Sequence, residues 1–147
     1  MNYYLLTAIL VLLLALALGY WLFFVRVSYD AGEVILGGDK FHVEIAKNLK
    51  QQMQGLSGKE SLREREGMVF IYSKQTIPSF WMKDMNFPID IIWVRDKKII
   101  GLVEGAEPAG YKRGEIFRPA SEIDLVIEVN SGIVKKLGLQ INDSIKF

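Results

Sequence analysis

The hydrophobic pattern separates an apolar N-terminal run from a longer region of short, alternating segments. Residues 3–25 contain no charged side chain, and a helix of this length spans about 34 Å at ~1.5 Å per residue. Because that exceeds the ~30 Å hydrocarbon core of a bilayer, the pattern predicts a single transmembrane helix. Tyr3 and Tyr4 near one end, and Tyr20 and Trp21 near the other, fit the interfacial preference of aromatic rings.

A cleaved secretory signal is the alternative interpretation of this run, because such signals are also N-terminal and apolar. The run is longer than the ~7–15 apolar residues of a signal, and no Lys or Arg precedes it. We therefore expect the membrane to be a partner of the chain through residues 3–25. Too few basic residues flank the run for the positive-inside rule to indicate an orientation.

Beyond residue 26, apolar positions recur in short segments that are typical of β-strands. Phe41–Ile45 alternates apolar and polar side chains, as a half-buried strand does, whereas Gly67–Tyr72 is apolar on both faces and is expected in the middle of a sheet. Further strands are predicted at Glu33–Leu36, Ser79–Lys83, Ile89–Val94, Ile99–Val103, Leu125–Val129 and Ser144–Phe147. Short turns between several of them favour antiparallel hairpins, with Ser79–Lys83 as the central strand.

A short helix is predicted after the strand Phe41–Ile45. Asn48 is expected to cap it, the side chain of Gln51 to reach back to the cap, and Gly55 to end it. Leu49 and Met53 are expected to face the core.

The C-terminal part contains a second predicted helix, Ser131–Leu137, with the serine as its cap. Ser61–Glu64 predicts one further helical turn. Many short strands and only brief helices predict a mainly β fold, either a sandwich or a partly closed barrel. We place a transmembrane anchor at residues 1–26, a linker at 27–39 and the β domain at 40–147.

Composition excludes several kinds of chemistry. The chain has no cysteine, so disulfides, cysteine-based zinc sites and cysteine nucleophiles are absent. All 18 basic and 17 acidic residues follow the apolar run and give a net charge of +1, which does not suggest nucleic-acid binding. His42, the single histidine, lies on the polar face of a predicted strand without a second His nearby, so we predict no metal site and no cofactor.

The stretch from Phe80 to Asp90 concentrates aromatic, thioether and charged side chains. In strand geometry Phe80 and Met82 point one way, while Trp81 and Lys83 point the other. An exposed Trp offers a flat face to a sugar or another ring, a Lys supplies charge, and carboxylates accept hydrogen bonds from hydroxyl groups. This pattern favours a binding site for a small molecule or a glycan.

The candidate ligand-binding residues are Trp81, Lys83, Asp84, Asp90 and Ser121, the last from the long segment Gly105–Ser121. A purely structural interpretation is also open. In that case Lys83 pairs with Asp90 across a hairpin and Trp81 packs under the long segment, as cross-strand pairs commonly do.

Two further alternatives belong to other functional classes. A hydrolase would use Asp84 and Asp90 as a carboxylate pair, or Ser121 and Lys83 as nucleophile and base, although the chain has no Gly-x-Ser-x-Gly or Ser-x-x-Lys motif. A protein-interaction module of the cell envelope would dock a partner, whose identity the sequence leaves open, on the apolar surface around Trp81, Trp93 and the long segment.

Several motifs of the predicted domain occur together in a definite order. They are Gly55-Leu56, Gly67-Met68-Val69-Phe70, Phe80-Trp81-Met82-Lys83, Pro88-Ile89-Asp90, Glu128, Gly132 and Gly138. On these motifs the chain, from about Phe41 to its C-terminus, resembles the family known as domain of unknown function 192. The resemblance implies a mainly β, jelly-roll-like sandwich behind an N-terminal signal or membrane segment, and hence an extracytoplasmic location. It implies no specific activity.

The chain departs from the common residues of this family at three places. Asp84-Met85 stands where Asn and Thr are common, Ser57-Gly58 replaces a frequent Met-aromatic pair, and Asn142 replaces a common Gly. A carboxylate in place of a neutral amide changes the local charge at Asp84.

Overall fold

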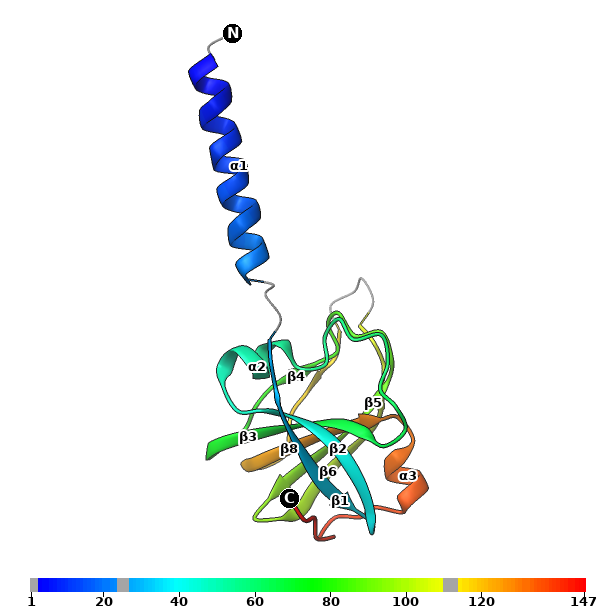
Figure 1. Ribbon diagram of the computed structural model, residues 1–147. Coiled ribbons are helices and arrows are strands. Elements are labelled where there is room, and N and C mark those ends of the chain that lie inside the picture. Colours follow the sequence, from blue (N-terminus) through cyan, green and yellow to red (C-terminus); the bar gives the residue numbers. More distant parts are fainter. Residues whose placement is uncertain (1–2, 24–26, 110–113) are drawn as a thin grey trace.

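The computed structural model describes residues 3–23, 27–109 and 114–147, and it contains an apolar helix and a β-rich domain (Figure 1). Helix α1 spans Tyr3–Phe23; the last two residues of the predicted membrane span lie outside the described ranges. Within those ranges α1 is the one helix long and apolar enough to cross a membrane, and none of its Tyr3–Tyr20 window is buried. A helix of this kind could act as a membrane anchor or as a signal sequence.

Six strands of the domain form one mixed sheet. In spatial order they are β1 (Asp30–Leu36), β2 (Asp39–Ala46), β3 (Glu66–Thr76), β8 (Ile123–Asn130), β5 (Ile89–Arg95) and β6 (Lys98–Ala106). The prediction of a mainly β fold is confirmed, and β3 lies in the middle of the sheet as expected. The sheet is not a closed barrel. The prediction of antiparallel pairing is wrong for β2 and β3, which are parallel, whereas the other neighbours in this sheet are antiparallel.

The parallel pair explains the position of helix α2 (Leu49–Gln54), because parallel neighbours require a crossover connection over one face of the sheet. The predicted capping box is confirmed: Asn48 Oδ1 accepts a hydrogen bond from Gln51 N at 3.0 Å, and Gln51 Oε1 accepts one from Asn48 N at 3.3 Å. The prediction that Leu49 and Met53 face the core is wrong, since they are 73% and 60% exposed. The amide of Gln51 faces inward instead, and its Nε2 donates to the carbonyl oxygen of Ser28 at 2.8 Å.

Both faces of the sheet are covered, so β5 and β8 are buried along almost their whole length. One core contains Val69, Ile92, Ile127 and Val129, together with Val134 of helix α3 (Ile133–Leu137). The other core contains residues of the opposite strand faces, among them Met68, Phe70, Ile91, Trp93 and Val126. Helix α2 and strand β4 lie over this second face (Figure 1).

Strands β4 (Phe80–Trp81) and β7 (Ile116–Phe117) form a separate antiparallel pair. The predictions that this segment is the central strand and forms a hairpin with β5 are therefore wrong, because β6 and β8 occupy the two edges of β5. The predicted alternation is confirmed. Phe80 and Met82 are buried, whereas Trp81 and Lys83 are exposed.

The segment expected as a linker contains β1, which pairs with β2 from Asp30 to Leu36 and is longer than the short strand predicted there. The predicted last strand forms only isolated bridges, between Ile35 and Lys146 and between Lys98 and Ser144. Since β1 and β6 are the two edges of the sheet, the C-terminal segment reaches from one edge to the other without closing a barrel.

Two local helix predictions are wrong. Ser61–Glu64 forms no helical turn. Ser131 does not cap α3, because the N-cap position falls on Gly132, which has no side chain to accept a hydrogen bond. The carboxyl group of Asp90 on β5 takes that role, by accepting a hydrogen bond from Val134 N.

Candidate functional site

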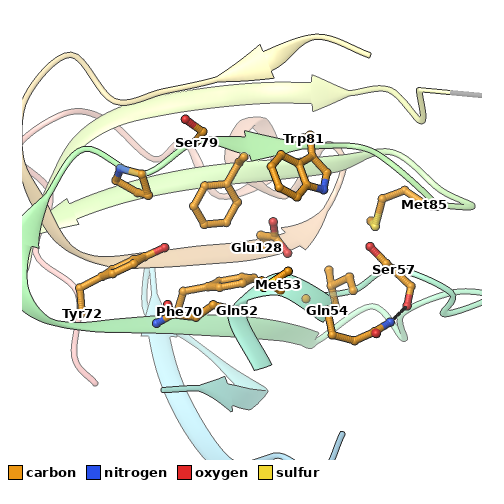
Figure 2. Close-up of a pocket in the computed structure, with 14 residues that line it drawn as sticks. Gln52, Met53, Gln54, Ser57, Phe70, Tyr72, Ser79, Trp81, Met85 and Glu128 are labelled. Carbon is orange, nitrogen blue, oxygen red and sulfur yellow. Dashed lines mark hydrogen bonds between the residues drawn. The ribbon is translucent and has the colours of Figure 1, made fainter. Parts of the chain in front are cut away.

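A cleft of about 230 Å³ opens between α2 and β4 on the second face of the sheet. Gln52, Met53, Gln54 and the turn after α2 form one wall, and Pro78, Ser79, Phe80 and Trp81 form the other, with Met85 beside it. Phe70 and Tyr72 of β3 and Glu128 of β8 lie deeper (Figure 2). The crossover helix and the separate β4–β7 pair thus frame the cleft.

Three aromatic rings pack edge to face in the inner part of the cleft. The ring centroids of Phe70 and Phe80 are 4.9 Å apart at an interplanar angle of 79°, and those of Phe80 and Trp93 are 5.3 Å apart at 76°. These edge-to-face contacts hold Phe80 in place. Because side chains alternate along a strand, burying Phe80 directs Trp81 outward, and Trp81 stands at the cleft half exposed.

Glu128 is the ionisable carboxyl group of the cleft. It is opposite Met68 of β3 and Ile91 of β5, whose side chains are fully buried. Glu128 itself is 6% exposed, and burial raises its pKa from 4.5 to about 8. No hydrogen bond or ion pair to its carboxyl group exists within the part of the chain that the structure describes. At neutral pH the carboxyl group is therefore mostly protonated.

The pKa values of two tyrosines near Glu128 are also raised. Burial, with Glu128 nearby, raises the pKa of Tyr72 to about 12. The pKa of Tyr29 also rises to about 12 through burial and the charges of Glu44 and Glu128. Tyr29 Oη donates to the carbonyl oxygen of Gly55 at 3.1 Å, just after α2.

Of the residues singled out from the sequence, Trp81 lines the cleft. Lys83 and Asp84 do not: both side chains point to solvent, with 75% and 70% exposed, and their charged atoms are 4.0 Å apart. Ser121 lies just before β8 and is not among the residues that line the cleft. Trp93 is 3% exposed and belongs to the core.

Asp90 has a structural position. It is fully buried, and its two carboxyl oxygens accept hydrogen bonds from Gly105 N at 2.9 Å and from Val134 N at 2.8 Å. Asp90 thus caps α3 from β5, which explains why Ser131 is not needed there. The ion pair between Lys83 and Asp90, which the alternative structural interpretation would require, does not form.

Two places where the sequence departs from the common residues of the resembled family meet at the rim of the cleft. Ser57 Oγ donates to the carbonyl oxygen of Lys83 at 3.0 Å, and Gly58 N donates to that of Asp84 at 2.8 Å. Asp84 has a φ of 57°, a left-handed conformation that Asp tolerates better than most residues. Ser57 and Met85 both line the cleft, so this contact shapes its mouth.

Sequence reasoning did not identify Glu128 as a site residue. The available signal was a single charged side chain inside the apolar run Leu125–Val129. The described residues contain no group of three His, Cys, Asp or Glu side chains able to hold a metal ion. His42 is 70% exposed, with Nδ1 at 3.6 Å from a carboxyl oxygen of Glu33.

The fold and the cleft define a class: a small mixed-β domain with an aromatic cleft over a buried acid. A family model, DUF192, described as Uncharacterized ACR, matches residues 33–147. The chain therefore belongs to the DUF192 family.

Two crystal structures are similar to this chain over most of its length. A protein of unknown function from Novosphingobium aromaticivorans DSM 12444 is 27% identical, with a TM-score of 0.73 over 80% of this chain and 85% of that one. A protein from Sinorhizobium meliloti 1021, described as a "putative transcription regulator", is 28% identical, with a TM-score of 0.75 over 82% of this chain and 96% of that one. No curated protein matches the chain significantly.

Proposed function

We propose that this protein binds a small organic molecule, or one sugar unit of a glycan, in the cleft between α2 and β4. The observation that carries the proposal is the buried carboxyl group of Glu128, which lines the cleft and has no hydrogen-bond donor among the described residues. Burial of an unpaired polar group costs free energy. A group that retains this cost in a concave aromatic site is typical of a functional site.

The other walls fit a compact ligand with a flat apolar face. Trp81 presents half of its surface at the mouth, and an indole face packs well against a sugar ring or an aromatic ring. The volume of about 230 Å³ admits a single ring with its substituents rather than an extended polymer.

The proposal also places the domain outside the cytoplasm, held at a membrane by α1 as a single-pass anchor. Helix α1 has 21 residues and no charged side chain, and its Tyr3–Tyr20 window is not buried against the domain. The extracytoplasmic side rests on the family resemblance, because the sequence has too few flanking charges to indicate an orientation.

Ligand-observed NMR on the full-length protein in nanodiscs tests the binding site. The panel contains neutral, cationic and anionic single-ring compounds and monosaccharides. We expect at least one class to bind, and Trp81→Ala to weaken its binding by roughly tenfold through loss of ring contact. Ile116→Ala is the matched control, because Ile116 pairs with Trp81 across β4–β7 and is 54% exposed but does not line the cleft.

Binding that Trp81→Ala leaves unchanged, or the absence of any binding, would contradict the proposal. Equal weakening by the two variants would favour a second candidate, a protein-interaction module that uses the exposed pair Trp81 and Ile116. Trp93 is buried and does not contribute to such a surface. The hydrolase alternative gains no support, since Asp84 is exposed and Asp90 is held by two backbone amides.

A further inference from the structure

We infer that the ligand of the cleft carries an organic ammonium group, which pairs with the carboxylate of Glu128 among the aromatic rings. This inference rests on the proposed function and names the chemical class of the ligand.

Glu128 differs from the other buried polar side chains of the described residues, Gln51 and Asp90, in its hydrogen bonding. Gln51 accepts hydrogen bonds from two backbone amides and donates one to a carbonyl oxygen. Asp90 accepts from two backbone amides. Buried polar groups are normally satisfied in this way. Of these three side chains, Glu128 alone has no hydrogen-bond partner among the described residues, and it lines the cleft.

The side chain of Glu128 points from β8 into the cleft. Glu128 lies on the same strand face as Val126 and on the opposite face from Ile127 and Val129, which belong to the other core. The close-up shows it between the wall that carries Trp81 and the wall that carries Gln52 (Figure 2). A ligand that fills the cleft therefore meets the carboxyl group at its inner end.

Among the described residues, those that line the cleft are aromatic or neutral apart from Glu128. The described residues that line the cleft include Phe70, Tyr72, Phe80 and Trp81, and none of them is basic. Aromatic faces attract cations, most strongly where water is excluded. Gln52 and Gln54 each donate one side-chain N–H, to the carbonyl oxygens of Ile71 and Ser57 respectively, and their amide oxygens are available as acceptors. Rings, acceptors and one acid suit an ammonium group better than an anion.

Binding of an ammonium group is linked to the loss of a proton from Glu128. With a pKa of about 8, Glu128 is mostly protonated in the empty cleft at pH 7. Pairing with R–NH₃⁺ requires the carboxylate, so binding releases one proton to solvent while the ammonium group keeps its own. Affinity then rises with pH by up to ~10-fold per unit below pH 8.

Two described tyrosines interact electrostatically with Glu128 and do not change charge in this pH range. Tyr72 of β3 and Tyr29, which precedes β1, stay neutral because their pKa values are about 12. Glu44 of β2, which acts on Tyr29, forms an ion pair with Lys59 at 2.9 Å. Helix α2 and strands β4 and β5 contribute no charged side chain to the described lining of the cleft.

Isothermal titration calorimetry of the full-length protein in zwitterionic nanodiscs tests this inference, with benzylamine and benzyl alcohol as matched cationic and neutral probes. We expect benzylamine to bind more tightly, to gain about ninefold in affinity from pH 6 to pH 7 and about fivefold from pH 7 to pH 8, and to release close to one proton between pH 6 and pH 7. The released proton appears as a dependence of the measured heat on the buffer. Empty nanodiscs provide the blank.

Glu128→Gln should abolish both the preference for the amine and the pH dependence, whereas Glu104→Gln, at an exposed position on β6, should change neither. The proton release of the unaltered protein keeps the test valid if Glu128→Gln folds poorly. Equal binding of the two probes, sensitive to Trp81→Ala, overturns the ammonium inference and leaves the proposed binding function standing. No binding of either probe at any pH contradicts both.

Discussion

At the scale of single residues, the acidic side chains of this domain differ by what surrounds them rather than by their type. Asp84 is in solvent, Asp90 is held by two amides, and Glu128 lies in the aromatic cleft with no hydrogen-bond donor among the described residues. The cost of burying a carboxyl group is offset at Asp90 by hydrogen bonds from two backbone amides. At Glu128 burial disfavours the charged form and raises the pKa, so the carboxyl group keeps its proton at neutral pH.

This difference predicts that Glu128 makes stability depend on pH. Because its pKa is about 8 in the folded protein and 4.5 for an ordinary glutamate in solvent, the folded state binds more protons between these values. Stability is therefore full below about pH 4.5, falls as pH rises toward 8 and is level above that, with a total loss on the order of 5 kcal/mol. Glu128→Gln should remove the decline.

Urea unfolding of the full-length protein in detergent, followed by tryptophan fluorescence from pH 4 to pH 9, measures this effect. The relevant quantity is the difference in unfolding free energy between the unaltered protein and Glu128→Gln at each pH. Glu104→Gln is the exposed control. A difference that does not change with pH would show that folding does not raise the pKa of Glu128.

At the scale of elements, buried polar side chains join parts of the chain that are far apart in sequence. Asp90 at the start of β5 ties that strand to the end of β6 through Gly105 and to the first turn of α3 through Val134. Gln51 ties α2 to the segment before β1. Asp90 thus joins two strands and a helix, and Gln51 joins a helix to the segment that leads into the edge strand β1.

We predict that Asp90→Asn destabilises the fold by about 2 kcal/mol. An amide accepts through one oxygen only, so its NH₂ group would face a backbone N–H and leave that donor unsatisfied. Asp84→Asn is the matched control and should leave stability unchanged, because that side chain is exposed. Thermal unfolding of the two full-length variants measures the difference. An unaffected Asp90→Asn variant would contradict the structural role of Asp90.

At the scale of the whole molecule, the chain combines a charge-free helix with a domain whose cleft lies between α2 and β4. The proposed arrangement predicts that the full-length protein sediments with membranes and is released by detergent but not by high salt or alkaline carbonate. Protease added to intact cells should digest the β domain. Complete protection would contradict the extracytoplasmic placement.

The alternative, a cleaved signal, makes a different prediction for the same cells. Mass spectrometry of the mature N-terminus would then find a chain without α1, and the β domain would be in the soluble fraction. An intact N-terminus in the membrane fraction supports the anchor.

Much of the fold follows from local patterns. The strand alternation at Phe80–Lys83, the two-sided apolar strand β3 and the capping box at Asn48 each depend on residues within a few positions of one another. The apolar helix α1 follows from an unbroken run of side chains without charge. For these features the physical cause is the periodicity of a strand or helix, or a hydrogen bond closed inside one turn, and both are readable along the chain.

The site required the tertiary structure, because its contacts are long-range. The parallel β2–β3 pair places α2 over one face of the sheet, and β6 and β8 fill the edges of β5, so β4 pairs with β7 instead. This arrangement separates Asp90, which caps α3, from Trp81, and it brings Glu128 to the cleft. The sequence by itself determined that the stretch around Trp81 has a buried and an exposed side. The tertiary structure decided which acid accompanies that tryptophan, because burial depends on what packs across the sheet.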